Sequence, residues 1–383
     1  MDGTFLTETD CEIGEFDKLC SRTLTRAEVP LAAAVEKNIP VYDCDALRDT
    51  MADRQARRPL MAEWARVLHD LSGVVVLKRA YADTTVIDEA TRVFERIIAD
   101  EKSREGGGAD HFAAAGANDR IWNSAQKLCL ADPHLFARYH GNPAVDAVCE
   151  AWLGPNYQMT AQVNLVRPGG KAQTAHRDYH LGFQTGEVAA QYPMHAHLLS
   201  AVLTLQGAVS HIEMPVEAGP TKLLPFSQLF TPGYLAYRQQ AFRDYFEAHH
   251  VQLPLSKGDA VFFNPALFHA GGENKTSDVQ RMVNLFQVSS AFGRAMESLD
   301  RVAMTKALMP ALRDLKLPAA ERHAAISAAA EGYSFPTNLD TDPPAGGLAP
   351  ETQAALLARA LDVGMGDAEF RAAVDSQTAR RAP

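Results

Sequence analysis

Residues 161–183 read AQVNLVRPGGKAQTAHRDYHLGF, and the rest of the chain is organised around this stretch. His176 and Asp178 stand two apart in a part of it that we expect to be extended. Residues two apart in an extended chain point to the same face, so an imidazole nitrogen and a carboxylate oxygen can meet at one point. A second histidine on a neighbouring strand would complete a set of metal ligands that suits Fe(II) and dioxygen.

An H-x-D pattern alone is common on protein surfaces, so this interpretation depends on a second stretch, residues 253–290. There, residues 260–263 predict a short buried strand, His269 follows at its end, and residues 271–275 predict a hairpin connection. Arg281 opens the next strand, 12 residues after His269. An arginine at that place can bind a carboxylate through two hydrogen bonds, as a 2-oxo acid chelating the metal would require.

With these motifs in this order, the sequence resembles the phytanoyl-CoA dioxygenase family of Fe(II)- and 2-oxoglutarate-dependent oxygenases over residues 73–291. The resemblance implies that His176, Asp178 and His269 are the catalytic iron ligands and that Arg281 anchors 2-oxoglutarate. It also places Thr221 near the cosubstrate. The family's usual Pro-Gly-Ser-His is replaced here by PFSQ at residues 225–228. Further candidate contacts of the cosubstrate are Gln162 and Asn164.

The resemblance and the sequence pattern predict the same fold class. Residues 157–290 contain short apolar runs separated by glycine, proline and asparagine, which predict strands. We expect an α+β protein with a double-stranded β-helix core, a cupin-like jelly roll framed by helices. Residues 72–294 would form this core, residues 1–71 an N-terminal helical extension and residues 295–383 a C-terminal helical extension.

Two further segments carry structural expectations. Residues 103–118 are rich in glycine and alanine and predict a long loop of the kind that often covers an active site. Residues 191–206 predict one long strand or a strand pair. This segment contains His195 and His197, whose H-x-H spacing could also suit a metal, but no suitable arginine follows it, so we favour positions at the pocket mouth.

The substrate pocket is the least legible feature of the sequence. Several polar and basic side chains near the motifs would line the mouth of the pocket if they face inward. Such a pocket would favour a small polar or acidic substrate. These candidate substrate contacts are Arg177, Tyr179, His180, His195, His197 and His211.

Composition narrows the class of protein further. The formal net charge of −10 argues against nucleic acids and anionic membranes as partners, and no apolar stretch is long enough to span a bilayer. The acidic N-terminus lacks the apolar core of a signal peptide. Five irregularly spaced cysteines without a C-x-x-C motif predict free thiols in a reducing, cytoplasmic protein. The sequence is compatible with a homo-oligomer.

The resulting expectation is a dioxygenase that uses Fe(II), 2-oxoglutarate and O2 to hydroxylate a small molecule, releasing succinate and CO2. The carboxylate of Asp178 disfavours halogenation, whereas desaturation, ring closure and epimerisation stay open. One alternative is a cupin-like metal-dependent isomerase, hydrolase or binding protein without oxidative chemistry. Another is a catalytically inactive barrel that serves as an interaction module.

Overall fold

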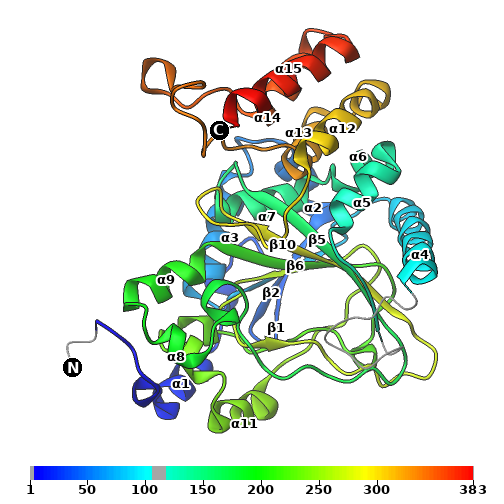
Figure 1. Cartoon of the computed structure of the whole chain (residues 1–383). Coiled ribbons are helices and arrows are strands. Elements are labelled where there is room, and N and C mark those ends of the chain that lie inside the picture. Colours follow the sequence, from blue (N-terminus) through cyan, green and yellow to red (C-terminus); the bar gives the residue numbers. More distant parts are fainter. Residues whose placement is uncertain (1–3, 106–117, 383) are drawn as a thin grey trace.

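The computed structural model describes residues 4–105 and 118–382. Its centre is an eight-stranded sheet in the order β1-β2-β3-β8-β6-β10-β5-β4 (Figure 1). Neighbouring strands are antiparallel except β2 and β3, which are parallel. The strands are β1 Ala34–Glu36, β2 Ile39–Asp43, β3 Val74–Lys78, β4 Asn118–Ile121, β5 Gln158–Val166, β6 Thr204–Ser210, β8 Ala260–Phe263 and β10 Arg281–Ser289.

A smaller second layer faces one side of this sheet. It consists of β7 (Lys222–Leu223) and β9 (His269–Ala270), which pair antiparallel. Isolated bridges extend it from His176 to His269 and from Leu223 to Val251. The two layers form the predicted double-stranded β-helix.

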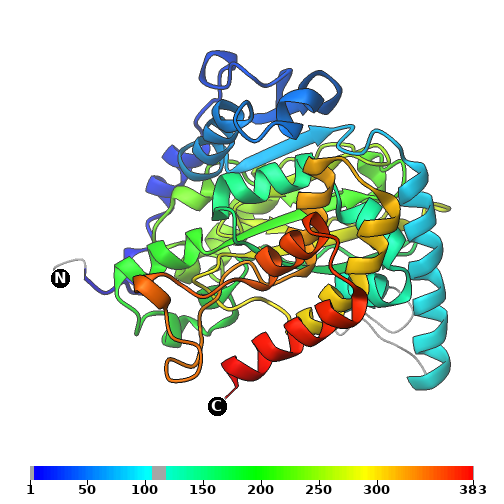
Figure 2. The same ribbon diagram turned by 90° about the horizontal axis from the view of Figure 1, so that it is seen from above.

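The other side of the large sheet is covered by helices (Figures 1 and 2). Alternate residues of the central strands, such as Val163, Phe286 and Val209, are fully buried in the main apolar core that the sheet shares with these helices. The helices are α1 Ile13–Cys20, α2 Cys44–Ala52, α3 Arg58–Asp70, α4 Thr85–Glu105, α5 Ser124–Ala131, α6 Pro133–His140, α7 Pro143–Leu153, α8 Gly186–Ala189, α9 Met194–Val202, α10 Gly233–Ala236, α11 Gln240–His249, α12 Arg301–Leu315, α13 Ala319–Ala329, α14 Gln353–Asp362 and α15 Asp367–Arg381. None of them is long and apolar enough to cross a membrane.

Three sequence expectations differ from the observed elements. Residues 271–275 do not form a hairpin connection, because β9 pairs with β7 in the small layer and β10 belongs to the large sheet. The first 71 residues are not only helical, because β1 and β2 add two strands to the edge of the large sheet. Residues 191–206 do not form one strand: α9 occupies residues 194–202 and β6 begins only at Thr204. A short apolar run without turn residues fits a helix as well as a strand, and Pro193 precedes the helix as its N-cap residue. Most of the predicted loop at 103–118 lies outside the described residues.

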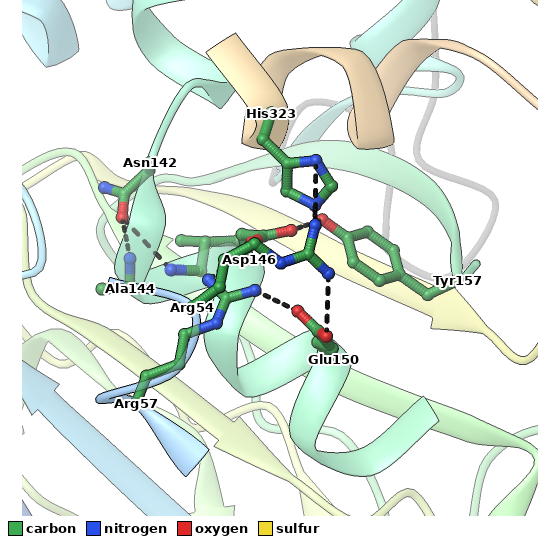
Figure 3. A network of polar contacts seen from close by, with 9 residues as sticks. Arg54, Arg57, Asn142, Ala144, Asp146, Glu150, Tyr157 and His323 are labelled. Atoms are coloured by element: carbon green, nitrogen blue, oxygen red, sulfur yellow. Dashed lines mark hydrogen bonds and ion pairs between the residues drawn. The ribbon is translucent and has the colours of Figure 1, made fainter. Parts of the chain in front are cut away.

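A buried ion network joins the N-terminal extension to the core and the C-terminal helices (Figure 3). Arg57, which is 1% exposed, lies 2.8 Å from Asp146 and also contacts Glu150, both on α7. Arg54 binds Glu150 at 3.2 Å and reaches His323 on α13 at 3.1 Å. Asp146, Glu150 and His323 have the spacing of metal ligands, but two arginines already satisfy the carboxylates, so the network is structural.

Replacing Arg57 by alanine is expected to lower the free energy of unfolding by about 3–5 kcal/mol, because it leaves Asp146 buried without its arginine partner, whereas Glu150 keeps Arg54. Arg54 provides the matched control. Its side chain is 53% exposed, so its replacement by alanine should cost less than about 1 kcal/mol. Denaturant unfolding measures both variants, and equal losses would contradict this account of the network.

Candidate active site

Three side chains converge between the two layers of the β-helix. His176 and Asp178 lie in the extended segment after β5, and His269 begins β9. Asp178 Oδ1 lies 3.7 Å from Nε2 of His176, and Asp178 Oδ2 lies 3.3 Å from Nε2 of His269. Backbone hydrogen bonds between His176 and His269, of 3.0 and 3.1 Å, fix the register that brings these side chains together.

Both imidazole rings are oriented by the backbone. Nδ1 of His176 lies 2.8 Å from the carbonyl of Thr174, and Nδ1 of His269 lies 2.8 Å from the carbonyl of Leu267. A carbonyl only accepts, so each Nδ1 carries the proton and each Nε2 is left with a lone pair. This arrangement is typical of histidines that bind a metal through Nε2.

The ionisation states also fit a metal centre. Burial, followed by the neighbouring His269, lowers the pKa of His176 and favours its neutral, ligating form. Burial alone would raise the pKa of Asp178, but the adjacent His176 and His269 and the hydrogen bond from Gln206 hold it well below its usual range. Gln206 Nε2 donates to Asp178 Oδ2 at 2.6 Å and so fixes the carboxylate. Two imidazoles and one carboxylate are the donor set that suits Fe(II).

Arg281 is a buried cation at the start of β10, and its side chain belongs to the inner face of the sheet. Its Nη1 donates to the carbonyls of Gly219 and Gly272, the latter at 2.9 Å. Burial lowers the pKa of Arg281 to about 10. In residues 4–105 and 118–382, no carboxylate forms an ion pair with it. A buried guanidinium without a counter-ion is costly, so this site fits an anionic ligand such as a dicarboxylate.

The other expected cosubstrate contacts lie on the same side of the sheet or at its edge. Gln162 and Asn164 face inward from β5, opposite Leu285 and Val283 of β10. Gln162 is engaged within the protein, because its Oε1 accepts from Arg120 at 2.9 Å and its Nε2 donates to Gln287 at 2.8 Å.

Asn164 Oδ1 is buried and has no hydrogen-bond partner in the part of the chain that the structure describes. Thr221 follows the turn whose carbonyls accept from Arg281. Contact of Thr221, Gln162 and Asn164 with the cosubstrate stays a prediction.

Arg177 does not face the substrate, contrary to the sequence expectation. Its guanidinium donates to the carbonyls of Ser227 at 2.6 Å and Phe230 at 2.9 Å, between the rings of Tyr234 and Phe268. The alternation that puts His176 and Asp178 on one face puts Arg177 on the other.

His211 also points away from the triad. It is 2% exposed and lies under α4 and α6, where Thr91 and Tyr139 hydrogen-bond to its ring at 2.8 Å. Burial lowers its pKa to about 3. His211 is therefore a neutral core residue, and its predicted contact with substrate is wrong.

His195 and His197 do not form a pair either, because both lie on α9. Two residues along a helix differ by about 200° in direction. His197 is buried and its Nε2 contacts the carbonyl of Ala189 at 2.9 Å. Its contact with substrate stays a prediction. His195 is exposed, and a role for it at the pocket mouth stays a prediction.

Tyr179 and His180 remain candidate substrate contacts. Both adopt positive φ, 65° and 45°, which is strained for bulky side chains and often marks a functional site. The Tyr179 hydroxyl and His180 Nε2 are buried and lack hydrogen-bond partners among the described residues.

Sequence reasoning missed Gln206, which contacts the triad, and Glu297, which lies near Gln162 farther along the sheet. The signal for Gln206 was a polar residue within the apolar run TLQGAV of residues 204–209. Reading residues 191–206 as one strand concealed which face it occupies. No local pattern marks Glu297, which follows β10 and reaches the site only through the tertiary fold.

Comparison with known proteins identifies the family. The sequence profile of the family phytanoyl-CoA dioxygenase (PhyH) matches residues 70–283, more than half of the chain. Dioxygenase trt7 of Aspergillus terreus is 24% identical over 225 residues, which cover 57% of this chain and 71% of that protein.

Two solved structures are similar to part of this chain. The 2-oxoglutarate-dependent epimerase SnoN of nogalamycin biosynthesis is 18% identical, with a TM-score of 0.44 over 61% of this chain and 84% of that one. HygX of Streptomyces hygroscopicus, solved with nickel and 2-oxoglutarate, is 14% identical, with a TM-score of 0.40 over 62% and 90% of the two chains.

Proposed function

The chain belongs to the phytanoyl-CoA dioxygenase family of Fe(II)- and 2-oxoglutarate-dependent dioxygenases, and from this premise we propose that it hydroxylates a small-molecule substrate. The observation that carries the proposal is the convergence of His176, Asp178 and His269, each in the protonation state and orientation of a metal ligand. These three side chains would hold Fe(II). Arg281 would hold the far carboxylate of 2-oxoglutarate.

When bound, Fe(II) and 2-oxoglutarate supply the oxidising chemistry: O2 is consumed, 2-oxoglutarate becomes succinate and CO2, and the substrate receives an oxygen atom. The protein's own residues would bind the metal and the cosubstrate and hold the ligand side chains in place. The carbonyls of Thr174 and Leu267 hold the two imidazoles, and Gln206 holds the carboxylate of Asp178. Arg281, fixed by carbonyls of the turn at Gly219 and of Gly272, presents a rigid positive charge to the cosubstrate.

Asp178 occupies a ligand position, so the site favours oxygen transfer over halide binding. The non-oxidative cupin-like alternative would leave Arg281 as a buried cation without a function. The five cysteines are free thiols, which supports a reducing compartment and our proposal of a cytoplasmic location.

Reaction type is tested with labelled dioxygen. The purified protein is incubated with Fe(II), 2-oxoglutarate and candidate substrates, and succinate and the organic product are measured by mass spectrometry. Hydroxylation predicts one labelled oxygen atom in the product for each succinate formed. A product of unchanged mass would show epimerisation, and one lighter by two hydrogen atoms would show desaturation or ring closure; either would contradict hydroxylation.

A further inference from the structure

A row of polar side chains leads away from the metal ligands along the inner face of the sheet. Gln206, which donates to Asp178 at 2.6 Å, stands directly opposite Gln287 in the pairing of β6 with β10. Gln287 accepts from Gln162 of β5 at 2.8 Å, and Gln162 accepts from Arg120 of β4 at 2.9 Å. Gln162 lies two strands away from Gln206 and is offset by two residues from the position opposite Gln287, which Thr160 occupies.

Glu297 ends this row. It lies in the segment that follows β10, outside the residues matched by the family. Its Oε1 accepts from the backbone N–H of Asn123 at 2.7 Å, whereas Oε2 is buried without a hydrogen-bond partner among the described residues. Burial raises the pKa of Glu297, and the nearby Gln162 amide and the charges of Lys127 and Arg120 oppose that shift.

The polar atoms along this row that have no hydrogen-bond partner among the described residues are mainly acceptors. Besides Glu297 Oε2, they are Gln206 Oε1 and the hydroxyl of Tyr179, both buried and without a partner in the described part of the chain. Tyr179 is buried close to both Asp178 and Glu297. Buried polar atoms are normally satisfied, so the row fits a ligand that brings its own hydrogen-bond donors.

A cavity of about 510 Å³ adjoins Glu297. Its wall includes Gln158 at the start of β5, Arg301 at the start of α12, Gln353 on α14 and Gln377 on α15. The volume is that of a typical small-molecule site.

We propose that Glu297 determines substrate specificity by accepting a hydrogen bond from a hydroxyl or amino group of the substrate, whose body occupies the cavity under the C-terminal helices. This inference rests on the proposed function. The substrate class is a hydroxylated or aminated small molecule. The C-terminal extension thereby forms one wall of the substrate site.

The test compares Glu297→Gln with wild type and with Glu321→Gln. Glutamine keeps an oxygen for the Asn123 N–H, so the start of α5 stays supported. Glu321 is a matched control because it is half-buried on α13, away from the cavity, and burial also raises its pKa. The probes are polyols and amino sugars, the same compounds after O- or N-acetylation, and fatty acyl-CoA thioesters. Probe-stimulated succinate formation and the thermal midpoint are measured.

We expect polyols or amino sugars to stimulate wild type and their acetylated forms to lose this effect. Glu297→Gln should raise KM for the active probe about 10- to 100-fold, as for loss of a hydrogen bond to a charged group, while Glu321→Gln leaves KM unchanged. All three proteins should bind 2-oxoglutarate equally in the presence of Fe(II).

Three results would overturn this assignment. They are a response confined to acyl thioesters, no response to any polyol or amino sugar, and the same KM for Glu297→Gln as for wild type. If wild type does not bind 2-oxoglutarate, the proposed function itself fails, so the two failures are distinguishable.

Discussion

Replacing Asp178 by alanine is expected to weaken Fe(II) binding by about 10²–10³-fold, and 2-oxoglutarate turnover should fall with it. Removing one partner from a buried set of charges costs about 3–5 kcal/mol, and each 1.4 kcal/mol is a factor of ten. Asp178 is the only carboxylate that contacts both His176 and His269 in the described part of the chain. Without it, two neutral imidazoles would face the metal with no compensating negative charge.

Equilibrium dialysis with Fe(II) under anaerobic conditions measures this effect, and thermal unfolding checks that the variant is folded. His195→Ala is a suitable control for iron binding, because His195 is exposed on α9. Wild-type iron affinity in Asp178→Ala would refute the assignment of the metal site.

Replacing Arg281 by alanine is expected to raise the 2-oxoglutarate concentration needed for half-maximal turnover by about 10²–10³-fold, with Fe(II) affinity unchanged. Truncating one partner of a buried hydrogen-bonded charge pair costs about 2–5 kcal/mol. Arg281→Lys should be less severe, because lysine keeps the charge but lacks the planar pair of donors that matches a carboxylate.

Arg177 provides the matched control for Arg281. Burial lowers the pKa of both arginines to about 10, and both donate to backbone carbonyls. Arg177, however, is packed against the backbone of Gly233, where a Cβ atom would lie 1.9 Å from its guanidinium carbon. Arg177→Ala should therefore lower the thermal midpoint without changing the requirement for 2-oxoglutarate. The same increase in 2-oxoglutarate requirement for both variants would contradict the anchoring role of Arg281.

Part of the candidate metal site could be predicted because its geometry is local. The two-residue period of an extended chain places His176 and Asp178 together. The hairpin expected between His269 and Arg281 was wrong, because β9 pairs with β7 in the small layer whereas β10 lies between β5 and β6 in the large sheet. The same period places Arg177 on the opposite face, so that error came from grouping by residue type rather than from missing information. The double-stranded β-helix was predicted for the same reason, since its strands are short apolar runs separated by turns.

The rest depends on contacts between distant parts of the chain. His211 follows β6 directly, and only the packing of α4 and α6 shows that it faces the helices. β2 joins the sheet by pairing parallel with β3, and α2 and α3 lie between these strands in the sequence. No local turn motif predicts this pairing. Glu297 approaches Gln162 because the segment after β10 turns back over the end of β5, and the sequence around Glu297 carries no motif.

The central claim is that His176, Asp178 and His269 hold Fe(II) while Arg281 presents 2-oxoglutarate to it. The most direct test is to add Fe(II) and then 2-oxoglutarate to the metal-free protein under anaerobic conditions and record the weak visible charge-transfer band of a chelated 2-oxo acid. The account predicts the band in wild type, its loss in Asp178→Ala and a requirement for far more 2-oxoglutarate in Arg281→Ala. Iron binding without the band at any 2-oxoglutarate concentration would contradict it.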